Sequence, residues 1–160
     1  MLVYLSVEKQ SIKEIMNQHI IFVAEDDEDD QFLLQSAFAS TGIACKLVFF
    51  DNGEQLIAGL ALAEKRPTLV LLDLNMPVMD GFQTLSLLRN NDAYKTIPVL
   101  VLTTSSQRED VSLAYSMGAN SFITKPHQYA DLARTVEQLQ QFWLGMASIP
   151  QLTNEKQPVA

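Results

Sequence analysis

Short apolar runs recur along the chain at intervals of roughly 25 residues. Most of them are continuous rather than alternating with polar residues, which is typical of strands buried on both faces of a parallel sheet. The runs are Ile20–Ala24, Cys45–Phe50, Thr68–Leu72, Pro98–Leu102 and Ser121–Thr124. The pattern therefore predicts a strand at each of these positions.

Segments with the apolar spacing of amphipathic helices follow each predicted strand. A capping box at Ser106 and Glu109 predicts where the fourth helix begins. The fifth helix is expected to end near Ala147. The residues predicted to face the core, helix by helix, are Phe32, Leu33, Ser36, Ala37 and Ser40; Leu56, Ile57, Leu60 and Ala63; Phe82, Leu85 and Leu88; Val111, Ala114 and Tyr115; and Leu132, Val136, Leu139, Trp143 and Met146.

Strands that alternate with helices favour right-handed βαβ units and a parallel sheet. The order of the segments predicts an α/β fold of the flavodoxin-like (βα)5 type, a doubly wound parallel sheet with strand order 2-1-3-4-5. We expect a single domain over residues 19–147 of the 160. Residues 1–18 are then an N-terminal extension and residues 148–160 a flexible C-terminal tail.

Composition narrows the range of functions. Lys and Arg number 11 and Asp and Glu 19, which gives a net charge of −8 and leaves no basic footprint for nucleic acid. Cys45 is the only cysteine, so no internal disulfide forms. A secretory signal is lacking, and so is a run of about 18 apolar residues that would span a membrane. We therefore expect a cytoplasmic protein that binds neither nucleic acid nor membrane.

Polar residues follow the predicted strands where each one ends. Glu25 and Asp26 follow the first strand, Asp73 the third, Thr103 the fourth and Lys125 the fifth. In open parallel sheets, ligands bind outside the carboxyl ends of the strands, where the strand order reverses. We therefore expect these side chains to surround one site.

Several carboxylates held close together repel one another and raise one another's pKa unless a cation joins them. Carboxylate, carbonyl and water oxygens are the ligands that Mg²⁺ prefers. Asp26 and Asp73 are the expected direct ligands, with Glu25 acting through water and the backbone carbonyl of Asn75 as a further ligand. The sequence thus predicts a Mg²⁺ site.

A carboxylate beside Mg²⁺ can attack phosphorus and form an acyl phosphate. Asp73 is the expected phosphoacceptor. Lys125 would bring a positive charge to one phosphoryl oxygen and the Thr103 hydroxyl would bind another. The predicted chemistry is therefore transfer of a phosphoryl group to Asp73.

Four blocks of sequence resemble response-regulator receiver domains of the CheY-like superfamily, in the same order. They are Phe22–Asp27, Leu71–Gly81, Ile97–Thr103 and Gly118–Pro126, within a likeness that spans Ile20–Met146. The combination is most similar to single-domain regulators that work with phytochrome-type or hybrid histidine kinases.

The resemblance implies a stand-alone two-component response regulator. It implies that a sensor histidine kinase or a histidine phosphotransfer protein is the donor of the phosphoryl group on Asp73. It implies as well that the domain catalyses only its own phosphorylation and its slow dephosphorylation by hydrolysis. It also implies that Pro126 shapes the site through a cis Lys125–Pro126 bond. Two residues depart from the family pattern: Glu25 stands where Asp is usual, and Phe122 stands where Tyr is common.

The resemblance further implies a switch. Phosphorylation would draw Thr103 towards the phosphoryl group, and Phe122 would rotate into the space left behind. This movement would reshape the surface formed by the fourth helix, the fifth strand and the fifth helix. A homodimer through that surface, or through the fifth helix, is a second expectation.

Other functions fit the residues less well. Haloacid-dehalogenase-like enzymes need an acid two residues after the nucleophile, where this chain has Asn75. A flavodoxin-like cofactor site needs a phosphate loop after the first strand, where this chain has carboxylates. A receiver-shaped interaction module that works without phosphorylation remains open. Asp29 and Asp30 are interpreted as solvated acids of a helix N-terminus.

Overall fold

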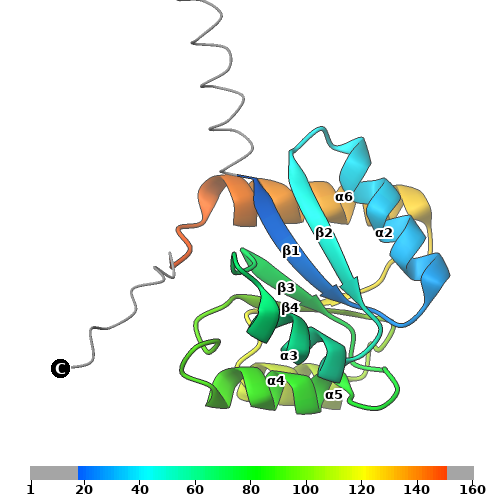
Figure 1. The fold of residues 1–160 in the computed structure, drawn as a ribbon. Helices are drawn as coiled ribbons and strands as arrows, with labels where there is room; N and C mark the ends of the chain where they lie inside the picture. Colours follow the sequence, from blue (N-terminus) through cyan, green and yellow to red (C-terminus); the bar gives the residue numbers. More distant parts are fainter. Residues whose placement is uncertain (1–17, 151–160) are drawn as a thin grey trace, which may run out of the picture.

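The computed structural model describes residues 18–150, so most of the predicted N-terminal extension and C-terminal tail lies outside the described residues. Strands and helices alternate throughout this part of the chain (Figure 1). The elements are β1 (His19–Ala24), α2 (Glu28–Ser40), β2 (Cys45–Phe50), α3 (Gly53–Leu62), β3 (Leu69–Leu72), α4 (Gly81–Asn90), β4 (Val99–Thr103), α5 (Arg108–Ser116), β5 (Ser121–Thr124), α6 (Tyr129–Gln140) and the π-helical turn η1 (Gln141–Met146).

The strands form one parallel sheet in the order β2-β1-β3-β4-β5. The predicted flavodoxin-like α/β fold is therefore confirmed. The predicted runs Cys45–Phe50 and Ser121–Thr124 match β2 and β5. β1 and β3 differ from prediction by one residue at the first end, and β4 is shifted by one residue at both ends.

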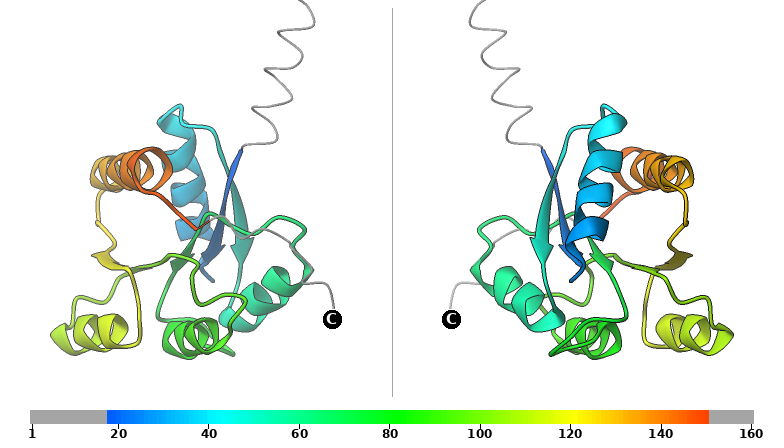
Figure 2. Two further views of the ribbon diagram at one scale, coloured as in Figure 1. Left: turned by 90° about the vertical axis from the view of Figure 1, so that its left-hand side faces the viewer. Right: turned by 90° about the vertical axis from the view of Figure 1, so that its right-hand side faces the viewer.

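Helices cover both faces of the sheet. α2 and α6 lie on one face, and α3, α4 and α5 lie on the other (Figures 1 and 2). Alternate residues of each strand enter the two resulting cores. In β1, for example, Ile21 and Val23 pack towards α2 and α6, whereas Phe22 and Ala24 pack towards α3 and α4.

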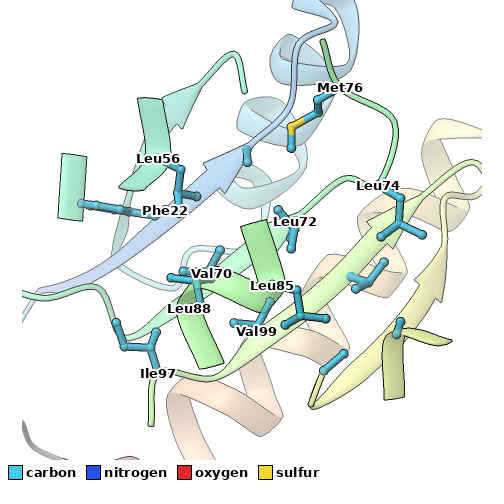
Figure 3. Close-up of a cluster of buried hydrophobic side chains, with 14 of the residues drawn as sticks. Phe22, Leu56, Val70, Leu72, Leu74, Met76, Leu85, Leu88, Ile97 and Val99 are labelled. Carbon is cyan, nitrogen blue, oxygen red and sulfur yellow. The ribbon is translucent and has the colours of Figure 1, made fainter. Parts of the chain in front are cut away.

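The core on the α3–α4–α5 side is made mostly of aliphatic side chains from the sheet, these helices and the loops between them, together with the aromatic ring of Phe22 (Figure 3). Leu56, Leu85 and Leu88, all predicted to face inward, are fully buried in it. This packing sets α3 and α4 firmly against the sheet and so supports the loops at its carboxyl edge.

The predicted buried face of α2 is wrong in its phase. Leu34, Ala37 and Phe38 are buried, while Phe32 is 71% exposed and Leu33 is 37% exposed. Consecutive apolar residues allow two helical stripes about one residue apart, and packing against the sheet and α6 selects the second one. Ala37 is common to both stripes and is buried as expected.

Three details of the later helices also differ from prediction. Tyr115 in α5, predicted to face the core, is 50% exposed. α5 begins at Arg108 with Gln107 as its N-cap and without a side-chain capping bond, so the capping box at Ser106 does not form. Instead, the hydroxyl of Ser105, the residue before Ser106, donates a hydrogen bond to the Asp110 carboxylate in the first turn of α5 and so fixes this turn. In η1, Met146 is 76% exposed rather than packed inward, because the π-helical turn changes the direction of the last side chains.

Side-chain caps fix the helix starts next to the carboxyl edge of the sheet. Asp27 accepts from the Asp30 N–H, Asn52 from the Gln55 N–H, and Asp80 from the Gln83 N–H in a full capping box. Asp80 thus has a structural role as the N-cap of α4. Within the described residues, no helix has the length and apolar character needed to cross a membrane.

Candidate functional site: an acidic pocket at the carboxyl edge of the sheet

Backbone hydrogen bonds between neighbouring strand ends place the predicted site residues. The Glu25 N–H donates to the Phe50 carbonyl at 2.9 Å, and the Asp73 N–H donates to the Ala24 carbonyl at 3.0 Å. These bonds extend the β1–β2 and β1–β3 pairing by one residue, so both carboxylates leave the sheet from fixed backbone positions.

A second pair is held at the other side of the pocket. The Lys125 N–H donates to the Thr103 carbonyl at 2.7 Å, which joins the ends of β4 and β5. Thr103 is fully buried, whereas the next residue, Thr104, is exposed. The predicted hydroxyl and ammonium groups therefore come from adjacent strand ends.

The carboxylates of Glu25, Asp26 and Asp73 form one group, with an oxygen of each within 4.8 Å of the others. Glu25 and Asp73 are buried, at 2% and 7% exposure, whereas Asp26 is exposed. Hard oxygen donors with one side open to solvent suit a divalent cation that keeps part of its water shell. The donor set therefore fits the predicted metal.

Lys125 lies among these acids. Its Nζ contacts Glu25 Oε2 directly, lies 2.8 Å from Asp30 Oδ2, and lies 3.6 Å from Asp73 Oδ2. The Lys125 side chain is only 10% exposed. The ammonium thus sits between the acidic triad and the first turn of α2.

Burial raises the pKa of the Glu25 carboxyl above its ordinary value, and the hydrogen bond from Lys125 offsets only part of this rise. Burial lowers the pKa of Lys125, but its hydrogen bonds to Asp30 and Glu25 and the charge of Asp73 outweigh burial and raise it. Lys125 is therefore charged at neutral pH, and an ionised Glu25 still lacks full compensation.

The remaining predicted residues lie around this pocket. Asn75 is exposed in the β3–α4 loop, and its N–H points to Asp73 Oδ1 at 3.4 Å. Phe122 is half-buried in β5, where it packs against the α3–α4–α5 core, and its N–H donates to the Tyr115 hydroxyl at 3.2 Å. The roles of these residues and of Asp26, Asp73, Thr103 and Lys125 stay predictions.

The expected cis Lys125–Pro126 bond is wrong. No peptide bond in residues 18–150 is cis, so this one is trans. The trans isomer is the more stable form of an X–Pro bond unless the surroundings hold the other. Pro126 still borders the site, where it lines a cavity together with Lys125.

Comparison with known proteins decides the family. The model of the response regulator receiver domain matches residues 21–137. The chain belongs to this family.

Relatives of this receiver domain cover nearly the whole chain. It is 35% identical to "Probable methanogenesis regulatory protein FilR2" of Methanothrix harundinacea, over 87% of this chain and 92% of that protein. It is 33% identical to response regulator Rcp1 of Synechocystis sp., over 82% of this chain and 92% of that protein.

Solved structures agree with this likeness. The phosphorylated cyanobacterial phytochrome response regulator RcpA superimposes with a TM-score of 0.79 at 33% identity, over 84% of this chain and 99% of that one. The Mn²⁺-bound form of response regulator Rcp1 gives a TM-score of 0.76 at 33% identity, over 83% and 99%. The predicted resemblance to single-domain regulators of this type is confirmed.

One charged residue at the site of this receiver domain was not predicted. Asp30 was interpreted as a solvated acid, but its carboxylate forms an ion pair with Lys125 at 2.8 Å and is only 34% exposed. Side chains of a helix lean towards its N-terminus, and the N-terminus of α2 faces the pocket. This direction brings Asp30 to the pocket, but it does not by itself distinguish Asp30 from the other acids of the same turn.

Mg²⁺ is expected to stabilise this receiver domain by relieving the repulsion within the triad. At about 100 times its dissociation constant, a ligand adds about 2.7 kcal/mol, which raises Tm by about 5–10 °C for a domain of this size. Thermal unfolding with MgCl₂, and with NaCl at equal ionic strength, measures the effect. Asp26→Asn should remove most of the rise; an undiminished rise in that variant would place the cation elsewhere.

Proposed function

We propose that this receiver domain is a two-component response regulator that accepts one phosphoryl group on Asp73 from a histidine kinase or a histidine phosphotransfer protein. The observation that carries the proposal is the position of Asp73, buried in the acidic triad with the Lys125 ammonium 3.6 Å from its Oδ2. A phytochrome-type kinase is the favoured donor, because Rcp1 and a phytochrome response regulator are among the relatives.

In the proposed reaction, an Asp73 carboxylate oxygen forms a bond to the phosphorus of a phosphohistidine as the phosphorus–nitrogen bond breaks. The bonding electrons return to the imidazole of the donor, which takes up a proton from solvent. Bound Mg²⁺ would neutralise charge on the phosphoryl oxygens. Glu25 and Asp26 would hold this cation beside Asp73, and the carbonyl of Asn75 would complete the protein ligands.

Lys125 and Thr103 would contact the product phosphoryl group. The ammonium lies on the α2 side of Asp73, and the Thr103 hydroxyl at the end of β4 accepts only a long bond of 3.4 Å from the Ser105 N–H. The hydroxyl is therefore free to turn and donate to a phosphoryl oxygen. Acyl phosphate formation would then be sensed at both strand ends.

The response would pass to the surface formed by α5, β5 and α6. Phe122 and Thr103 lie on the neighbouring strands β5 and β4. A shift of Thr103 towards the phosphoryl group would leave space for the Phe122 ring to enter. A homodimer through this surface or the end of α6 is part of the proposal. Phe142 and Met146, 49% and 76% exposed, supply apolar area there.

Intact-protein mass measurement with acetyl phosphate tests the proposal. The protein is expected to gain the mass of one phosphoryl group in the presence of Mg²⁺ and none after chelation of the cation. Peptide mapping should then place the group on the segment that contains Asp73. An unmodified protein under both conditions would favour the alternative, an interaction module that works without phosphorylation.

A further inference from the structure

Asp30 occupies a fixed position beside the pocket without belonging to the acidic triad. It lies in the first turn of α2, where its N–H donates to the N-cap Asp27 at 2.9 Å. Its Oδ2 accepts a hydrogen bond from Lys125 Nζ at 2.8 Å. The group of carboxylates suited to a cation consists of Glu25, Asp26 and Asp73, so Asp30 is an additional negative charge directed at the lysine.

The contacts of Lys125 engage two of the three N–H donors of its ammonium. An ammonium has three N–H donors. Glu25 and Asp30 accept two of them, and Asp73 Oδ2 at 3.6 Å is too distant to accept the third. The third donor is therefore available to an oxygen of a phosphoryl group attached to Asp73.

The carboxylates of Glu25 and Asp30 anchor the Lys125 ammonium, and a lysine needs such anchors because its four-carbon stem is flexible. Next to the pair lies a cavity of about 200 Å³ whose lining includes Asp30, Lys125, Thr104 and His127. An unanchored Lys125 side chain could move into this space and away from Asp73. The position of the ammonium thus depends on the carboxylates that hold it.

A bound cation makes the two anchors unequal. Glu25 belongs to the triad, so a cation there competes with Lys125 for its carboxylate. Asp30 does not belong to it and keeps its charge for the lysine. We propose that Asp30 is a positioning residue, which holds the Lys125 ammonium ready for the phosphoryl group once the cation engages Glu25. This inference rests on the proposed function and adds a residue to it.

The test uses beryllium fluoride, an anionic mimic of the phosphoryl group, at saturating Mg²⁺. Its apparent dissociation constant is measured by ¹⁹F NMR titration. Asp30→Asn is expected to weaken binding about fivefold, the size of a partly exposed ion pair of about 1 kcal/mol. Coulomb attraction alone predicts the opposite sign, because removal of a negative charge should tighten binding of an anion.

Matched variants separate positioning from other effects. Asp29→Asn removes the same charge from the same helical turn, and Asp29 is exposed to solvent, so binding should match the native protein. Asp30→Glu keeps the charge and should restore most of the affinity. In a Lys125→Ala background, Asp30→Asn should have no further effect, since the lysine it positions is gone. Tm values are recorded for all variants.

Each outcome is decisive. Equal affinities of Asp30→Asn and Asp29→Asn, with native-like Tm values, would overturn the inference and leave the proposed function intact. A fivefold loss that persists in the Lys125→Ala background would also overturn it, because Asp30 would then act without the lysine. Failure of the native protein to bind beryllium fluoride would instead refute the proposed function, and this inference with it.

Discussion

Replacement of Asp73 by Asn is expected to abolish the Mg²⁺-dependent gain of a phosphoryl group. The amide lacks the negative charge that makes the carboxylate oxygen a nucleophile, and an amide is also a weaker ligand than a carboxylate for a divalent cation. The fold should persist, because the change removes one charge from three crowded carboxylates. Intact mass after incubation with acetyl phosphate measures the loss, and thermal unfolding should show an unchanged or higher Tm.

Asp80→Asn is the matched control for this experiment. It makes the same change in the same β3–α4 loop, and Asn is as good an N-cap as Asp. Asp80 serves as the N-cap of α4, so the variant should fold and be phosphorylated like the native protein. Equal labelling of Asp73→Asn and Asp80→Asn would move the phosphoacceptor to another residue.

The strands could be predicted almost to the residue, and the reason is their environment. Strands such as β3, Leu69–Leu72, are fully buried on both faces, so their apolar residues are contiguous and easily recognised. The positions of the site residues could be predicted for the same reason, since the first polar residue after a buried apolar run marks the carboxyl end of the strand. Asp73 after β3 could thus be predicted from the sequence alone.

The helices show where the sequence was insufficient. The apolar residues Phe32, Leu33 and Leu34 are consecutive, so the pattern does not determine which of them faces the sheet. Packing against α6 decides it: Leu34 is buried and Phe32 is exposed. The phase of a helix with apolar residues on several sides is a tertiary property, which local periodicity cannot supply.

Asp30 could not be predicted for a related reason. It ends the acidic stretch Glu25–Asp30, in which every residue has the same chemistry, and its partner Lys125 is 95 positions away. Only the entry angle of α2 determines that Asp30 faces the pocket while Asp29 faces solvent. The sequence therefore shows that acidic residues gather near the site, but it does not show which of them contact Lys125.

Gly81→Ala is expected to destabilise the protein by about 3 kcal/mol, the upper range for overpacking a tight site. A Cβ at this position would lie 2.3 Å from the Asp73 carbonyl oxygen and 2.7 Å from Leu74 Cα, and backbone atoms cannot move aside as a flexible side chain does. The Gly81 N–H also donates to the Leu74 carbonyl at 3.0 Å, so the close approach is part of the loop. Denaturant unfolding measures the loss.

The same substitution should slow phosphorylation, because the clash displaces the backbone that carries Asp73. Gly145→Ala is the control: nothing lies within 4 Å of a Cβ added there, so its stability and rate of labelling should stay close to native. Lower stability and slower labelling can be measured separately, since a variant that is only less stable still reacts at the native rate while it is folded. A native labelling rate in folded Gly81→Ala would show that the loop absorbs the methyl group without moving Asp73, and that the start of α4 does not control the phosphoacceptor.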